Sequence, residues 1–315
     1  MIIQKNGKRE SYEKDQPHLM SFLKRFNELH QMKDIFYYLD FGMSDGMKYI
    51  NAEVENTFFI NSCNLATSGR RDGYYYLTAN SFNPRFKTLD FFSKEDNKKR
   101  QHIFNKYFKV EKDYKIKKDG YIVIFLNNFT GFFKETYNLD YEKVDFIKNS
   151  TLLKEEKVGL YNLVKLVETI RKYNQTNEIV LRVHPKTFIR KNVMECFKIL
   201  NLKVDNKSFN DTYTDINQLL KKTYCAFIQN TKLLFEIVAK GIPVFSLDIY
   251  HVNYFPEICI TDLSYLERLK TEQLELPNRH KFLKKQMKHI IFKNDFKDKY
   301  AEKYLLRLIK QIQSN

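Results

Sequence analysis

The segment from Tyr224 to Asp248 constrains the fold of this chain more than any other stretch. An apolar run, Ala226 to Ile228, ends at the polar pair Asn230-Thr231, and a short amphipathic segment follows. A glycine, a proline and a second apolar run, Val244-Phe245, come next. The pattern predicts a strand, a helix and a second strand. The start of such a helix, beyond the carboxyl end of a buried strand, suits an anionic phosphate.

Strand and helix patterns alternate from Tyr121 onward, which predicts a parallel sheet in an α/β domain. Strand patterns in the first half, such as Asp34 to Asp40, predict α/β structure there as well. The charged stretch Glu111 to Gly120 marks a boundary, and the segments Arg279 to Phe292 and Lys297 to Ile312 have the pattern of amphipathic helices. We therefore expect a first domain over residues 1–115, a second over 116–292, and a C-terminal helix over 293–315.

The chain of 315 residues has a formal net charge of +16, and its lysines are scattered in pairs without a basic arm or tail. Two interpretations stay open: an anionic partner (nucleic acid, sugar nucleotide or membrane surface), or codon usage that spreads lysines over a solvated surface. No apolar run approaches the roughly 20 residues of a membrane span. We expect a soluble cytoplasmic protein, with peripheral membrane association left open.

Cationic and hydrogen-bonding side chains gather at the end of one predicted strand, in Arg182-Val183-His184-Pro185-Lys186. Proline stops the strand, and alternation puts Arg182 and His184 on the same face. Arginine offers a planar fork and lysine a point charge, and both suit phosphate. The alternative is an ordinary strand end with a solvated basic loop.

Other polar side chains follow neighbouring strands. Asn127 comes directly after the strand Tyr121 to Leu126, and Glu236 lies in the helix after Thr231. A carboxylate there has the chemistry to bind ribose hydroxyls, although a surface helix acid is the alternative. In the first half, Asp40 ends a strand and Asp45 lies in the following glycine-containing loop. Either aspartate is a candidate general base, while Asp45 also fits an ordinary Asx turn.

Several motifs of other enzyme classes are missing. The chain has no GxGxxG, GxxxxGK[ST], GxSxG or HExxH motif, and its four cysteines form no CxxC pair. We therefore expect no cofactor and no metal ion, and a reaction in which protein cations meet the phosphates.

The run RVHPK, then NT-x4-EIVAKGIPVFS and a distal PNRHKFLKKQM, resembles the capsule-polysaccharide-type glycosyltransferases, which include Kdo transferases. In that family a basic residue precedes His-Pro, and a later Ser or Thr opens a helix that carries Glu-Ala and ends in Gly-Lys-Pro-Val. Thr231 matches the hydroxyl position, Glu236 matches the acid, and Ile242 stands where lysine is usual. The resemblance covers mainly residues 120–290.

The resemblance implies a GT-B-like fold, in which two Rossmann-like domains with C-terminal helices face each other across a cleft. It also implies that the last helix, within residues 293–315, crosses back to the first domain. The second domain would bind the nucleotide-sugar donor and the first the acceptor. The family's Glu-Asp-Gly stretch in the first domain has only a loose match at Leu39-Asp40-Phe41-Gly42, with Phe41 where the catalytic aspartate would stand. For that reason Asp45 is considered beside Asp40.

These observations together predict a metal-independent, inverting glycosyltransferase that acts on a surface or capsule-type glycan. Its candidate catalytic residues are Asp40, Asp45 and His184. Its candidate donor-binding residues are Arg182, Lys186, Asn127, Asn230, Thr231 and Glu236. Three alternatives stay open: a phage-type enzyme that glycosylates hydroxymethylated bases in duplex DNA, a sugar-nucleotide epimerase, and a non-catalytic nucleic-acid-binding protein.

Overall fold

The computed structural model describes residues 2–4, 17–33, 35–40, 55–63, 74–79, 98, 101–102, 105, 109–111, 116–126, 141–184, 189–205, 214–229, 233–247, 258–271, 279, 281, 283, 290–292, 295 and 299–314. The chain forms two compact units. Unit 1 consists of Met1–Tyr107 and Leu283–Asn315, and unit 2 of Phe108–Phe282. The boundaries predicted from the sequence lie several residues further along the chain at both points.

Unit 1 is built on a five-stranded sheet in the order β1-β2-β3-β4-β11. β1, β2 and β3 run parallel, whereas β4 is antiparallel to both β3 and β11. The strands are β1 (Ile2–Gln4), β2 (Ile35–Asp40), β3 (Thr57–Cys63), β4 (Tyr74–Ala79) and β11 (Ile290–Phe292).

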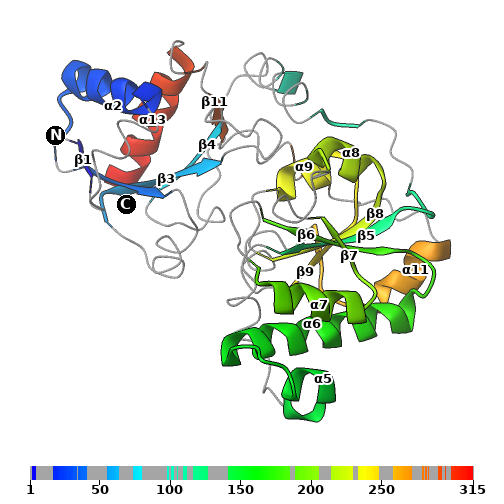
Figure 1. Ribbon diagram of the computed structural model, residues 1–315. Coiled ribbons are helices and arrows are strands. Elements are labelled where there is room, and N and C mark those ends of the chain that lie inside the picture. Colours follow the sequence, from blue (N-terminus) through cyan, green and yellow to red (C-terminus); the bar gives the residue numbers. More distant parts are fainter. Residues whose placement is uncertain are drawn as a thin grey trace. The chain divides into compact units, whose positions relative to one another are not determined.

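Two helices from opposite ends of the chain share the core of unit 1, α2 (Pro17–His30) and α13 (Lys299–Gln313) (Figure 1). Their apolar residues recur at helical spacing, so each helix buries one face against the strands. Nε2 of His30 lies 2.9 Å from Oε1 of Glu302, which links the two helices. The last segment of the chain is thus an integral part of the first unit.

The helix predicted over Arg279 to Phe292 is wrong in its last residues. Ile290–Phe292 forms β11, in antiparallel register with Tyr74 to Tyr76 of β4. Isoleucine and phenylalanine favour the half-buried surface of a strand, and pairing with a sheet edge overrides a weak helical pattern.

Unit 2 contains a six-stranded, all-parallel sheet in the order β10-β9-β8-β5-β6-β7. Counted from β5, its first strand, the order is 3-2-1-4-5-6, which is the Rossmann arrangement. The strands are β5 (Tyr121–Leu126), β6 (Ile179–Val183), β7 (Lys203–Asp205), β8 (Thr223–Ile228), β9 (Val244–Ser246) and β10 (Cys259–Ile260). The central strands β5, β6 and β8 are buried along almost their whole length, as their apolar runs predict.

Helices cover both faces of this sheet (Figure 1). On one face, the core contains residues of α5 (Asp145–Lys148), α6 (Lys154–Tyr173), α7 (Lys191–Ile199) and α11 (Tyr265–Thr271). On the opposite face lie α8 (Ile216–Lys221) and α9 (Leu234–Ala239). A short 3-10 helix, η2 (Tyr141–Lys143), precedes α5. The predicted α/β class is therefore confirmed.

A cluster of charged side chains fixes the segments of unit 2 that lead to unit 1. Buried Lys240 donates from Nζ to the carbonyl of Lys109 at 3.0 Å and to Oε1 of Glu111 at 3.2 Å. Buried Arg279 donates to the carbonyl of Glu111 at 2.6 Å. Both crossing points of the chain lie within a few residues of this cluster, so the two connections are tied to the end of α9.

Candidate functional site

The carboxyl edge of the unit 2 sheet is the place where its strand order predicts a ligand. β5 and β8 are neighbours, and the helices that come after them, α6 and α9, lie on opposite faces of the sheet. Such a switch in strand order opens a crevice outside the carboxyl ends of the strands, where open α/β sheets bind their ligands. In this chain the crevice is expected beyond Leu126 and Ile228.

His184 lies at this edge, directly after β6. Its backbone N–H donates to the carbonyl of Leu126 at 2.9 Å, so the bonding between β6 and β5 continues past both strands. The residue is exposed. His184 therefore occupies the strand end that the sequence predicted, next to the end of the central strand.

Glu236 lies in the first turn of α9 and is buried. Its Oε2 atom has no hydrogen-bond partner among the described residues. Burial raises the pKa of Glu236 from 4.5 to about 8, with a small opposing effect from its own backbone N–H. At neutral pH the side chain is thus a carboxylic acid, which donates one hydrogen bond and accepts others. The alternative interpretation of Glu236 as a surface acid is wrong.

Arg182 is buried in β6 rather than open to a ligand. Its Nη1 atom binds the carboxylate of Asp205 and donates to the carbonyl of Thr214 at 2.7 Å. Asp205 also accepts from the backbone N–H of Thr214 at 3.1 Å. The guanidinium therefore ties β6 to β7 and to the start of α8. We therefore assign Arg182 a structural role, and its contact with a donor phosphate stays a prediction.

The residues that lead directly into α7 are held by side-chain contacts. Ile189 is buried, and Arg190, the N-cap of α7, donates from Nε to Oε1 of Glu156 at 2.7 Å and from Nη2 to Oε2. Oε2 of Glu156 also accepts from the backbone N–H of Leu153, which caps α6. This bidentate pair holds the starts of α6 and α7 together. The sequence analysis missed it, because Glu156 and Arg190 are far apart along the chain and match no motif.

The remaining predicted residues give less information. Asp40 is the last residue of β2 in unit 1, where it is paired in register with Asn61. Five others lie outside the described residues: Asp45, Asn127, Lys186, Asn230 and Thr231. The structure thus places His184 and Glu236 at one edge of the unit 2 sheet and Asp40 in the other unit.

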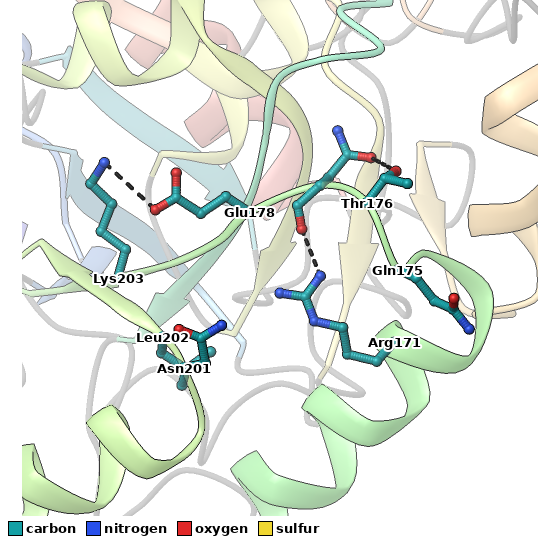
Figure 2. A pocket seen from close by; sticks show the side chains of 8 residues that line it. Arg171, Gln175, Thr176, Glu178, Asn201, Leu202 and Lys203 are labelled. Atoms are coloured by element: carbon teal, nitrogen blue, oxygen red, sulfur yellow. Dashed lines mark hydrogen bonds and ion pairs between the residues drawn. The ribbon is translucent and has the colours of Figure 1, made fainter.

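A cavity of about 580 Å³ lies at the opposite, amino edge of the same sheet (Figure 2). Figure 2 shows Arg171 directed toward the turn before β6, where it donates to the carbonyl of Asn177 at 2.7 Å. The cavity is lined by Arg171, Gln175, Thr176, Asn177, Glu178, Asn201, Leu202 and Lys203. It contains none of the predicted site residues. Among the described residues, His, Cys, Asp and Glu side chains form no group of three that would suit a metal ion.

Comparisons with known proteins give distant structural likenesses. No protein-family model and no curated protein matches the sequence. The structure is similar to KpsC, a β-Kdo 2,7 transferase of Thermosulfurimonas dismutans, with 10% identity, 98% of each chain covered and a TM-score of 0.43. It is also similar to TarM of S. aureus, with 10% identity, 87% of this chain and 50% of that chain covered, and a TM-score of 0.35.

A third likeness is to a candidate UDP-N-acetylglucosamine 2-epimerase of Listeria monocytogenes. Its identity is 14%, its TM-score is 0.31, and 98% of this chain and 95% of that chain are covered. At such identities and TM-scores, the fold described above rests on the strand order and helix positions of this chain itself.

Proposed function

We propose that this chain is a glycosyltransferase that moves a sugar from a nucleotide-sugar donor to an acceptor hydroxyl of a surface or capsule-type glycan. In the proposal the transfer is metal-independent and inverting. The observation that carries it is Glu236, a buried carboxyl group whose Oε2 has no hydrogen-bond partner among the described residues, near the carboxyl edge of a sheet with the 3-2-1-4-5-6 order.

Glu236 has the chemistry of a ribose contact. An unpartnered oxygen in a buried carboxyl group costs free energy until a ligand supplies a hydrogen bond. A ribose diol both donates and accepts, and a neutral carboxylic acid does the same. The residue follows β8, one of the two strands beside the predicted crevice. A bound nucleotide would therefore supply the hydrogen bond that Oε2 of Glu236 lacks among the residues that the structure describes.

His184 has the role of a phosphate contact in this proposal. It is exposed directly beyond β6 and is held by its backbone to the end of β5. A hydrogen-bond donor at that position would stabilise the negative charge that develops on the departing nucleotide. Asn127, Lys186, Asn230 and Thr231 stay predicted donor contacts, and Asp40 or Asp45 stays the proposed general base.

The first test is a thermal-shift screen of the full chain against nucleotides and nucleotide sugars, followed by a transfer assay with the donor that binds. One class of donor is expected to raise the melting temperature in a saturable way. Glu236→Gln, which removes the acid but keeps the shape, is expected to weaken the binding of that donor about tenfold. His184→Ala is expected to abolish transfer while leaving the fold intact.

His18→Ala is the matched control, because His18 is exposed on α2 in unit 1. It is expected to behave like the unmodified chain. Unchanged donor affinity in Glu236→Gln, or unchanged turnover in His184→Ala, would contradict the proposed site. Turnover of the sugar nucleotide without any acceptor would favour an epimerase, and transfer to hydroxymethylated duplex DNA would favour the DNA-acting alternative.

A further inference from the structure

Cationic side chains gather at the amino edge of the unit 2 sheet, on the segments that precede four neighbouring strands, β8, β5, β6 and β7. We call this region the amino-edge surface. Its cations are Lys117, Lys118, Arg171, Lys172, Lys203, Lys221 and Lys222. The same segments carry two exposed acids, Asp119 and Glu178. The surface therefore has an excess of positive charge that the scattered lysine pairs of the sequence did not reveal.

Little within the described part of the chain neutralises the exposed lysines among these cations. Lys203 lies 3.6 Å from Glu178, but both side chains are about half exposed, so the pair contributes little. Lys221 and Lys222 are exposed and form no ion pair with any residue that the structure describes. Most of the positive charge at this edge is thus available to a partner.

The amino-edge surface is hollowed and contains aromatic rings. Beside the cavity of Figure 2 lies a second one of about 450 Å³, and Lys203 lines both. Tyr121, Lys221 and Lys222 also line the second cavity. Nζ of Lys203 lies 5.1 Å from the ring centre of Tyr121, and Nζ of Lys172 lies 5.3 Å from that of Tyr173. Such pairs keep a charge in water above an apolar ring.

We infer that the amino-edge surface docks unit 2 on an anionic lipid surface. Adjacent strands are about 4.8 Å apart, so cations before four neighbouring strands form a front about 15 Å wide rather than one phosphate pocket. Clusters of four to eight Lys and Arg residues are typical of binding to anionic lipids. This inference stands independently of the proposed glycosyl transfer.

The kind of cation favours a lipid surface over a nucleic acid. The exposed cations are all lysines, Lys118, Lys172, Lys203, Lys221 and Lys222. Lysine is a point charge that responds to a diffuse field, whereas arginine supplies the planar fork used for phosphate and base contacts. The arginine of the surface, Arg171, is half buried and bound to the carbonyl of Asn177. The tyrosines add amphipathic rings of the kind found at membrane interfaces.

The test is co-sedimentation of the full chain with vesicles. Pure phosphatidylcholine vesicles are compared with vesicles in which about a third of the lipid is phosphatidylglycerol, at low and at physiological salt. The chain is expected to bind only the anionic vesicles, and less well as salt rises. The double variant Lys221→Gln with Lys222→Gln is expected to lower the partition coefficient about 10- to 30-fold, because each lysine near an anionic surface contributes up to about fivefold.

The matched control is Lys303→Gln with Lys310→Gln, which removes the same charge from exposed positions on α13. It is expected to bind within about twofold of the unmodified chain, and the melting temperatures of both variants should match it. Equal losses in the two double variants would show that binding depends only on net charge, which would overturn the inference. A failure of the unmodified chain to bind anionic vesicles would overturn it as well. Binding of a labelled oligonucleotide that depends on Lys221 and Lys222, without vesicle binding, would assign the surface to nucleic acid instead.

Discussion

Two regions of unit 2 differ in whether their buried acidic side chains have a described partner. Around β6 and α7, each buried acid meets an arginine: Asp205 binds Arg182, and Glu156 binds Arg190. On α9, Glu236 is equally buried, and its Oε2 has no partner among the described residues. A paired buried acid is explained by the architecture, whereas an unpaired one reduces stability. This contrast is the reason that we propose ligand binding, rather than packing, as the role of Glu236.

The largest loss of stability is expected for Asp205→Ala, which removes the acid of a buried pair. The change leaves the guanidinium of Arg182 buried without its carboxylate, and it also removes the acceptor of the Thr214 backbone N–H. We expect the free energy of unfolding to fall by about 3–5 kcal/mol, measured by chemical denaturation. Replacing both partners, Arg182→Met with Asp205→Leu, is expected to recover much of that loss. A loss below about 1 kcal/mol in Asp205→Ala would contradict the structural role of the pair.

The second prediction is that replacing Glu236 raises the stability of the fold, whereas replacing Asp205 lowers it. Its pKa is raised from 4.5 to about 8, so the folded state holds a proton that the unfolded state releases. The stability of the unmodified chain therefore falls as pH rises from about 4.5 to about 8 and then levels. Glu236→Gln removes this dependence and is expected to be more stable by up to about 5 kcal/mol above pH 8, with little difference below pH 5.

Thermal or urea unfolding across that pH range measures the Glu236 effect. Glu168→Gln is the control, because Glu168 is an exposed acid paired with Lys165, and no comparable gain is expected there. A Glu236→Gln variant that is less stable than the unmodified chain at high pH would show that the carboxylate has a stabilising partner. Greater stability together with weaker donor binding would sharpen the assignment of Glu236 to function.

The smallest change in stability is expected at the pair of Glu156 and Arg190, in which Arg190 is partly exposed. The hydrogen bond from Arg190 lowers the pKa of Glu156, so this group stabilises the fold above its unfolded pKa, and the contribution is lost as pH falls through the folded value. Glu156→Gln also weakens the cap of α6 and is expected to lower the free energy of unfolding by about 1–2 kcal/mol near neutral pH. The difference should shrink in acid. An effect that is independent of pH would contradict the ion pair.

The sequence predicted the unit 2 sheet well because its strands are short, apolar and separated by helical patterns. The strand from Tyr121 to Leu126 was predicted with its observed bounds. Unit 1 was harder. β1 was not predicted, and β11 was taken for a helix, since a three-residue strand has no periodicity of its own and is defined by its neighbour.

The site was predictable where a residue follows a strand, and less so where burial decides its role. His184 could be placed from the proline after it. The sequence could not show that Arg182 is bound by Asp205, because that partner lies in another strand. Nor could it show that Glu236 is buried, since a glutamate in a short helix is more often exposed. Which partner a charged group meets depends on tertiary contacts that pattern and spacing do not encode.

The position of α13 has a consequence for how the chain folds during synthesis. Unit 2 is continuous, so its sheet can be complete once about the first 280 residues have left the ribosome. Unit 1 cannot be complete at that point, because its core includes Tyr304, Leu308 and Ile312 of α13. The half that is made first is therefore finished last, and a nascent chain that lacks its final 15 or so residues would expose the apolar face of α2 to chaperones.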